Sequence, residues 1–90
     1  MTRNARRPVT PGWGRPYKVA VGRRLREWRE EVDLSQAELA RRAGIVPGTL
    51  SLIEQGETLP LPATQRGLAA ALGVDVGDLL ARLTDDPHAR

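Results

Sequence analysis

The side chains that could take part in chemistry are few in this chain, and their arrangement suits binding better than catalysis. There is no cysteine, and the single histidine, His88, lies in a polar stretch near the end of the sequence. Adjacent acidic pairs, Glu30-Glu31 and Asp85-Asp86, do not face each other on a helix and are expected to be solvated. Neither a glycine-rich phosphate loop nor a cluster with the spacing of metal ligands is present. We therefore expect no enzymatic activity, no cofactor and no metal site.

One stretch, residues 34–56, has instead the pattern of a binding unit. Ser35 and Glu38 form a capping box at the start of a helix, and Gly44 ends that helix as a C-terminal cap. Pro47 suits the first turn of a second helix, because the N–H that proline lacks is not needed there. Two helices joined by such a sharp turn are the usual device for placing one helix in a DNA groove.

The spacing of apolar residues predicts five helices that would position this unit. The segments with helical spacing or helix-end signals are residues 18–32, 35–43, 47–55, 62–72 and 75–83. The residues expected on the buried face of the first helix are Val21, Leu25, Trp28 and Val32. Strand patterns are absent from the sequence, which predicts an all-α domain.

The charge of the chain is divided unevenly. The net charge of +3 suggests an anionic partner. Residues 1–17 hold four basic and no acidic residues, whereas the remainder holds ten basic and eleven acidic ones. We predict a flexible basic arm over residues 1–17, a folded domain over residues 18–83 and a disordered tail over residues 84–90. No apolar run has transmembrane length, so we expect a cytoplasmic protein that does not associate with membranes.

Residues 21–83 resemble the phage-repressor/Cro-like (XRE-type) helix-turn-helix domain family. The matches keep the family's order and spacing: Gly22, Arg24-Leu25, Arg29, Leu34-Ser35-Gln36, Glu38-Leu39-Ala40, Ala43-Gly44-Ile45, Thr49-Leu50-Ser51, Ile53-Glu54, Gly56, Pro60, residues 69–74 and Asp78-Leu79-Leu80. The resemblance implies a compact five-helix lambda-repressor-like domain that binds double-stranded DNA as a transcription regulator. It also implies a homodimer on a near-palindromic operator, and repression is the natural assignment.

The resemblance further implies which side chains meet DNA. Gln36 would point at the DNA backbone from the start of the second helix. Arg41, on the outer part of that helix, would either contact phosphate or remain a solvated charge. Arg29 and Glu54 hold positions that commonly pair across the helices, and we predict that ion pair as structural. The residues expected to face the major groove are Val46, Pro47, Gly48, Thr49, Ser51, Leu52 and Gln55.

The third helix departs from the family in its chemistry. Only Thr49, Ser51 and Gln55 can form hydrogen bonds there, whereas family members usually present several long polar side chains that read base edges. One interpretation is a readout through short contacts, with Val46, Pro47 and Leu52 against thymine methyl groups and with Gly48 allowing close approach of the backbone. The alternative is a helix-turn-helix scaffold that serves as a protein–protein interaction module in transcription control.

The two ends of the domain offer further contacts. Gly14-Arg15-Pro16 is similar to the Gly-Arg-Pro core of AT-hook peptides, in which the arginine lies along a narrow minor groove. Otherwise Arg15 belongs to an unstructured basic tail. Leu79, Leu80 and Leu83 are many leucines for one helix edge to bury, so this helix would either form a two-fold dimer seam or pack in the core.

Overall fold

Five helices and their connecting turns make up residues 15–84, the part of the chain that the computed structural model describes. The helices are α1 (Arg15–Glu31), α2 (Gln36–Ala43), α3 (Pro47–Glu54), α4 (Pro62–Leu72) and α5 (Val76–Thr84). Over this described range no residue belongs to a strand, and the prediction of an all-α, five-helix domain is confirmed.

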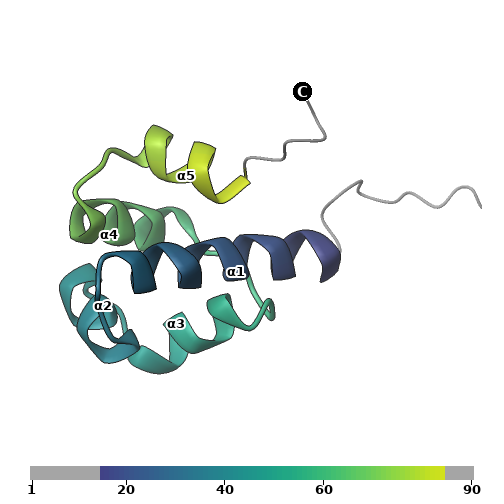
Figure 1. The fold of residues 1–90 in the computed structure, drawn as a ribbon, viewed down its shortest axis with the longest axis horizontal. Helices are drawn as coiled ribbons and strands as arrows, with labels where there is room; N and C mark the ends of the chain where they lie inside the picture. Colours follow the sequence, from purple (N-terminus) through teal and green to yellow (C-terminus); the bar gives the residue numbers. More distant parts are fainter. Residues whose placement is uncertain (1–14, 85–90) are drawn as a thin grey trace, which may run out of the picture.

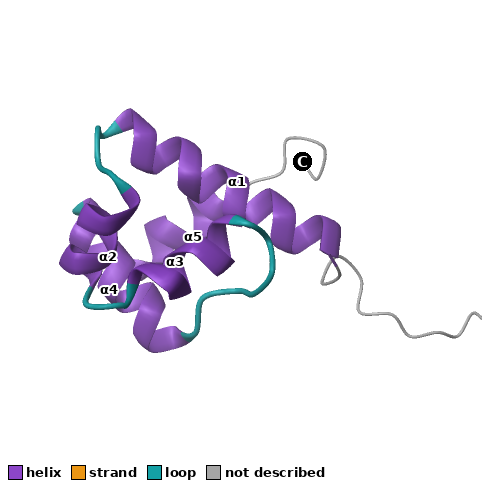
Figure 2. Ribbon diagram, turned by 90° about the horizontal axis from the view of Figure 1, so that it is seen from below, coloured by secondary structure: helices purple, strands orange, loops and turns teal. Residues whose placement is uncertain are grey.

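The longest helix, α1, is the axis on which the others are arranged (Figure 1). α3 packs along one side of it and α5 along the other, while α4 packs against both α2 and α5. Figure 2 shows α2 and α4 together at the end of α1 where that helix leads into the first turn. The helix-turn-helix pair is therefore supported by two other helices: α1 packs against α3, and α4 packs against α2.

Aliphatic side chains from all five helices form a single core, together with Trp28 of α1. The largest fully buried side chains are Leu25, Leu39, Leu50, Ile53, Leu68, Leu79 and Leu83. No polar or charged residue of the described range is buried in it as a whole. Burial of these apolar surfaces is the main favourable contribution to folding, and it fixes which face of each short helix turns outward.

The turn between α2 and α3 forms as the local sequence predicts, whereas the capping box predicted at the start of α2 forms only in half, because the Glu38 carboxylate pairs with Arg41 and Arg42. The hydroxyl of Ser35 accepts the backbone N–H of Glu38 at 3.0 Å and so caps α2. Gly44 has a φ of 73°, a left-handed conformation that side chains with a Cβ disfavour. The N–H of Ile45 donates to the carbonyl of Ala40 at 3.0 Å, which closes the end of α2 before α3 begins.

The backbones of α4 and α2 lie close together at Gly67. A Cβ placed there would lie 2.1 Å from the carbonyl oxygen of Ala43, a distance at which atoms overlap. The backbone of α4 therefore rests directly on the end of α2, and only glycine leaves room for it.

The start of α1 corrects the predicted boundary of the basic arm. The helix begins at Arg15, three residues before the predicted start at residue 18, so residues 15–17 are not part of an arm. Pro16 fits the first turn of a helix, where backbone N–H groups have no helical partner. Tyr17 packs against the core and helps to hold this turn. The rest of the predicted arm, residues 1–14, lies outside the described residues.

Two further expectations were wrong. Val32, predicted on the buried face of the first helix, is 43% exposed, because α1 ends at Glu31 and Val32 falls in the turn. Thr84, predicted in the tail, is the last residue of α5, where its hydroxyl donates to the carbonyl of Leu80 at 2.6 Å. The remaining tail, residues 85–90, lies outside the described residues.

Candidate nucleic-acid interface

The third helix, α3, turns one face to the core and the other to solvent. Leu50 and Ile53 are buried, while Val46 and Leu52 are 64% and 48% exposed. Val46, the residue before the helix, makes no side-chain hydrogen bond to the helix start, so the first backbone N–H groups of α3 have no side-chain cap. All the residues predicted to face the major groove are exposed or half-exposed: Val46, Pro47, Gly48, Thr49, Ser51, Leu52 and Gln55.

A hydrogen bond links two of the polar side chains on this outer face. The amide nitrogen Nε2 of Gln55 donates to the hydroxyl of Ser51 at 2.8 Å, across one turn of helix. This bond restricts the rotamers of both side chains. The Gln55 carbonyl oxygen and the Ser51 hydroxyl proton remain available to a partner.

A network of charged and polar side chains joins the C-terminal end of α3 to α1 and α2. Arg29 donates from Nε to Glu54 Oε2 at 2.7 Å and from Nη2 to Oε1 at 3.0 Å, which makes the bidentate pair expected between these residues. Arg29 also donates to the carbonyl of Leu34 at 2.9 Å. The hydrogen bond to Glu54 raises the pKa of Arg29 above its ordinary value, although burial acts in the opposite direction. One arginine thus fastens the first turn and the end of α3 to α1.

Gln36 belongs to the same network. Its amide nitrogen Nε2 donates to Glu54 Oε1 at 3.0 Å, so one of its two N–H donors is already used within the protein. The Gln36 side chain, which was predicted to point at the DNA backbone, is therefore fixed by its hydrogen bond to Glu54 of α3. Its carbonyl oxygen and second N–H remain for another partner.

An open hollow of about 370 Å³ lies where these three helices meet. Its lining residues are Arg26, Arg29, Gln36, Glu54 and Gln55. Four of these were singled out from the sequence, and Arg26 was not. A sequence signal did exist, because Arg26 lies one helical turn before Arg29 and hence on the same side of α1.

Arg41, also predicted to meet DNA, lies on α2 but not in this hollow. Its guanidinium and that of Arg42 both contact the same carboxylate oxygen of Glu38, at 2.5 and 3.0 Å. These two hydrogen bonds lower the pKa of Glu38 below its ordinary value. The structure therefore places Arg41 in a local ion-pair cluster that offsets part of its charge.

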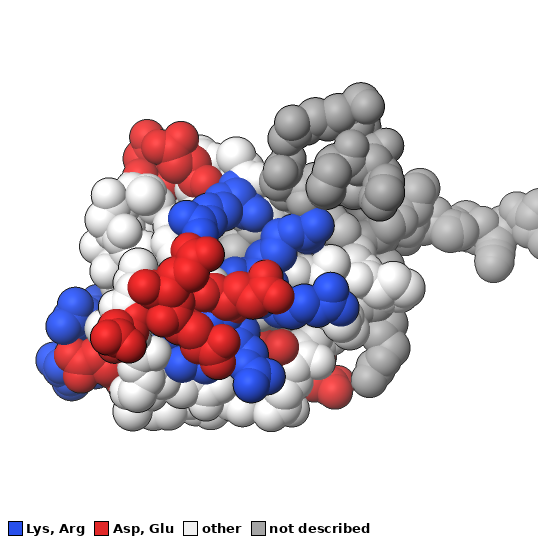
Figure 3. Space-filling model, viewed as in Figure 1, with Lys and Arg blue, Asp and Glu red and all other residues white. Residues whose placement is uncertain are grey.

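The surface over α1 carries both signs of charge. Figure 3 shows acidic side chains beside basic ones there rather than a continuous basic patch. The side chain of Arg15, the remaining predicted DNA contact, lies outside the described part of the structure, and its role stays a prediction. Within residues 15–84 there is neither a helix long and apolar enough to cross a membrane nor a group of three potential metal ligands.

Comparisons with known proteins agree with this geometry. The sequence model of the family described as "Helix-turn-helix domain" matches residues 20–83. The clp gene regulator ClgR from Corynebacterium glutamicum is 30% identical, with a TM-score of 0.64 over 73% of this chain and 70% of that chain. The restriction-modification controller protein C.AhdI from Aeromonas hydrophila is 32% identical, with a TM-score of 0.64 over 69% of this chain and 94% of that chain. The resemblance to XRE-type regulators is thus confirmed, and the chain belongs to the helix-turn-helix domain family of DNA-binding transcription regulators.

Proposed function

We propose that this DNA-binding regulator is a cytoplasmic repressor that inserts α3 into the major groove and sets the start of α2 against the DNA backbone. The observation that carries the proposal is the outer face of α3, where all the residues expected to meet DNA are accessible while Leu50 and Ile53 anchor the helix to the core.

The side chains on this face favour contacts to thymine methyl groups. Val46 and Leu52 expose apolar surface, and the major groove offers the C5-methyl of thymine as its apolar feature. Thr49 and Ser51 each add a hydroxyl that is able to donate or accept. Gly48 has open space around its Cα, which lets the backbone approach the bases closely. We therefore propose half-sites with A·T pairs opposite Val46 and Leu52.

Selection of bound duplexes from a random pool tests this function directly. We expect a selected half-site containing thymines whose replacement by deoxyuridine, which lacks only the methyl group, weakens binding about fourfold per position. This estimate takes about 0.8 kcal/mol for one buried methyl-sized group. The control is the same replacement at a flanking thymine outside the selected site. Failure to enrich any duplex at micromolar protein and low salt would refute DNA binding by this chain.

We propose that two copies of the chain pair with each other through α5 and together bind a near-palindromic operator. Leu79 and Leu83 are fully buried in the core, so they are not available to a dimer seam. Leu80 is half-buried and lines a small, mainly apolar hollow of about 130 Å³ beside Tyr17 and Leu59. Covering this hollow with a second α5 would bury Leu80 further. An inverted repeat among the selected duplexes supports the dimer, and a single half-site contradicts it.

The apolar face of α3 also suits a protein partner, which is the second candidate. Leu52→Glu separates the two functions, because it places a charge on the exposed face without touching the core. We expect this variant to lose operator binding, since the new carboxylate repels the phosphates around the groove. Ser51→Ala is the milder control on the same face. Undiminished duplex binding together with loss of a co-purifying protein would favour the interaction module.

A further inference from the structure

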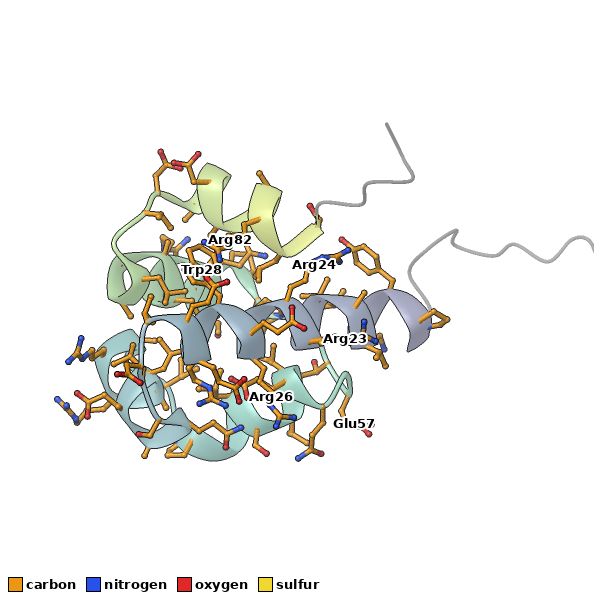
Figure 4. All side chains as sticks on the ribbon, in the orientation of Figure 1. Arg23, Arg24, Arg26, Trp28, Glu57 and Arg82 are labelled. Atoms are coloured by element: carbon orange, nitrogen blue, oxygen red, sulfur yellow. The ribbon has the colours of Figure 1, made fainter. Side chains whose placement is uncertain are left out.

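Arg26 is, beside the paired Arg29, a second cation of α1 on the side that faces α3. Figure 4 shows its side chain extending from α1 toward α3, and it lines the hollow together with Gln36 and Gln55. The side chain is 62% exposed and is therefore accessible to a ligand that the rest of the hollow admits.

The contacts of Arg26 leave most of its donors available. Its Nε donates to Glu30 Oε2 at 3.2 Å, and Glu30 is itself 54% exposed. An exposed i,i+4 pair of this kind contributes little stability, so exchanging the carboxylate for another anion costs little. The two Nη groups of the guanidinium fork match the oxygens of a phosphate group.

The other lining groups also suit a phosphate rather than a base. Arg29 and Glu54 cancel each other's charge in their bidentate pair, so Arg26 supplies the excess positive charge of the lining. Gln36 and Gln55 each retain one amide N–H after their hydrogen bonds to Glu54 and Ser51. Arg26, Gln36 and Gln55, which carry these donors, all line one open hollow beside the C-terminal end of α3.

We infer that this hollow receives one phosphate of the DNA backbone and that Arg26 is the residue that binds it. The inference rests on the proposed DNA binding and adds a contact from α1 to those expected from α2 and α3. Such a contact fixes the register of the protein on the duplex and is independent of the base sequence.

A matched pair of variants tests the contact in the full-length chain. Arg26→Ala and Arg42→Ala each remove one exposed guanidinium that pairs with a glutamate four residues away, but Arg42 lies on α2 and does not line the hollow. Binding to the selected duplex is measured by fluorescence anisotropy from low to moderate salt. We expect Arg26→Ala to weaken binding roughly three- to tenfold and to reduce the slope of log K against log salt by about 0.9. Arg42→Ala should leave that slope unchanged.

Neutral methylphosphonate linkages, introduced one at a time, locate the contact on the DNA. At one position in each half-site, the neutral linkage should weaken DNA binding by the wild type and by Arg42→Ala equally. It should not weaken binding by Arg26→Ala any further. If Arg26→Ala retains the wild-type slope and the wild-type response at every linkage, the inference is overturned while DNA binding stands. If the wild type binds no duplex, the proposed function and this inference fail together. Circular dichroism melting of both variants shows that any loss is not unfolding.

Discussion

At the scale of single residues, one carboxylate at the end of α3 fastens the recognition helix to its neighbours. The side chain of Glu54 is 3% exposed, and it accepts hydrogen bonds from both Arg29 and Gln36. The side chain of Arg29 is 11% exposed, so both charges of the pair are largely removed from water. A partly buried pair of this kind is costly to break, because the remaining charge loses its partner while staying partly removed from water.

Glu54→Ala is therefore expected to lower the free energy of unfolding by roughly 1.5–3 kcal/mol, because it removes the charge-assisted hydrogen bonds from Arg29 and Gln36. This loss is a sizeable share of the about 5–15 kcal/mol typical of a small domain. Urea denaturation followed by circular dichroism measures the change. Glu30→Ala is the control, because its exposed pair with Arg26 should contribute less than about 1 kcal/mol. Equal losses in the two variants would contradict the structural role of the Arg29–Glu54 pair.

At the scale of helices, the contact of α4 with the end of α2 depends on Gly67. An added Cβ overlaps the carbonyl oxygen of Ala43, so Gly67→Ala must push the two helices apart. We expect a loss of about 1–3 kcal/mol, the usual range for overpacking in a core, measured as a lower midpoint of urea denaturation. Gly48→Ala is the matched control, because a Cβ added at Gly48 would have no neighbouring atom within 4 Å and the φ there is not positive. A Gly67→Ala midpoint equal to that of Gly48→Ala would show that the helices are not in contact as described.

The helices were predictable because their signals are local. Periodic apolar residues mark the buried faces, and Ser35, Gly44 and Asp75 mark helix ends through hydrogen bonds and backbone angles set within a few residues. The left-handed conformation at Asp33, with a φ of 64°, follows the same logic. Val32 was misplaced because periodicity alone cannot show that the helix stops one residue earlier.

The tertiary details of the site were less accessible from the sequence. The pairing of Arg29 with Glu54 came from the family resemblance, but the bond from Gln36 to Glu54 joins residues 18 apart and needs the actual packing of α2 on α3. Gly67 gave no sequence signal, since a glycine within a helix pattern reads as a cost rather than as a contact. The position of Arg26 on the same side of α1 as Arg29 could be read from the sequence, but the hollow that both line requires the packing of α1 beside α3.

At the scale of the whole molecule, positive charge in the sequence is concentrated ahead of the helical domain. Residues 1–14 contain Arg3, Arg6 and Arg7 and no acidic residue. Replacing these three arginines by glutamine in the full chain should reduce the salt slope of operator binding by about 2–3, if each neutralises one phosphate. Circular dichroism melting of the triple variant checks that any loss of binding is not caused by unfolding. A wild-type slope in the triple variant would mean that this segment does not contribute to DNA binding.

The division of α3 into two faces has a consequence for how such a regulator changes its target. The inward side chains Leu50 and Ile53, with Glu54 at the helix end, carry the packing and the ion pair. The outward ones, such as Thr49 and Leu52, are not part of that packing. The outer residues can therefore be replaced without changing the packing of α3 or its ion pair with α1. A small library at these outer positions should yield folded variants with new, mutually independent operators, so that duplicated copies of this domain can diverge in specificity by few substitutions.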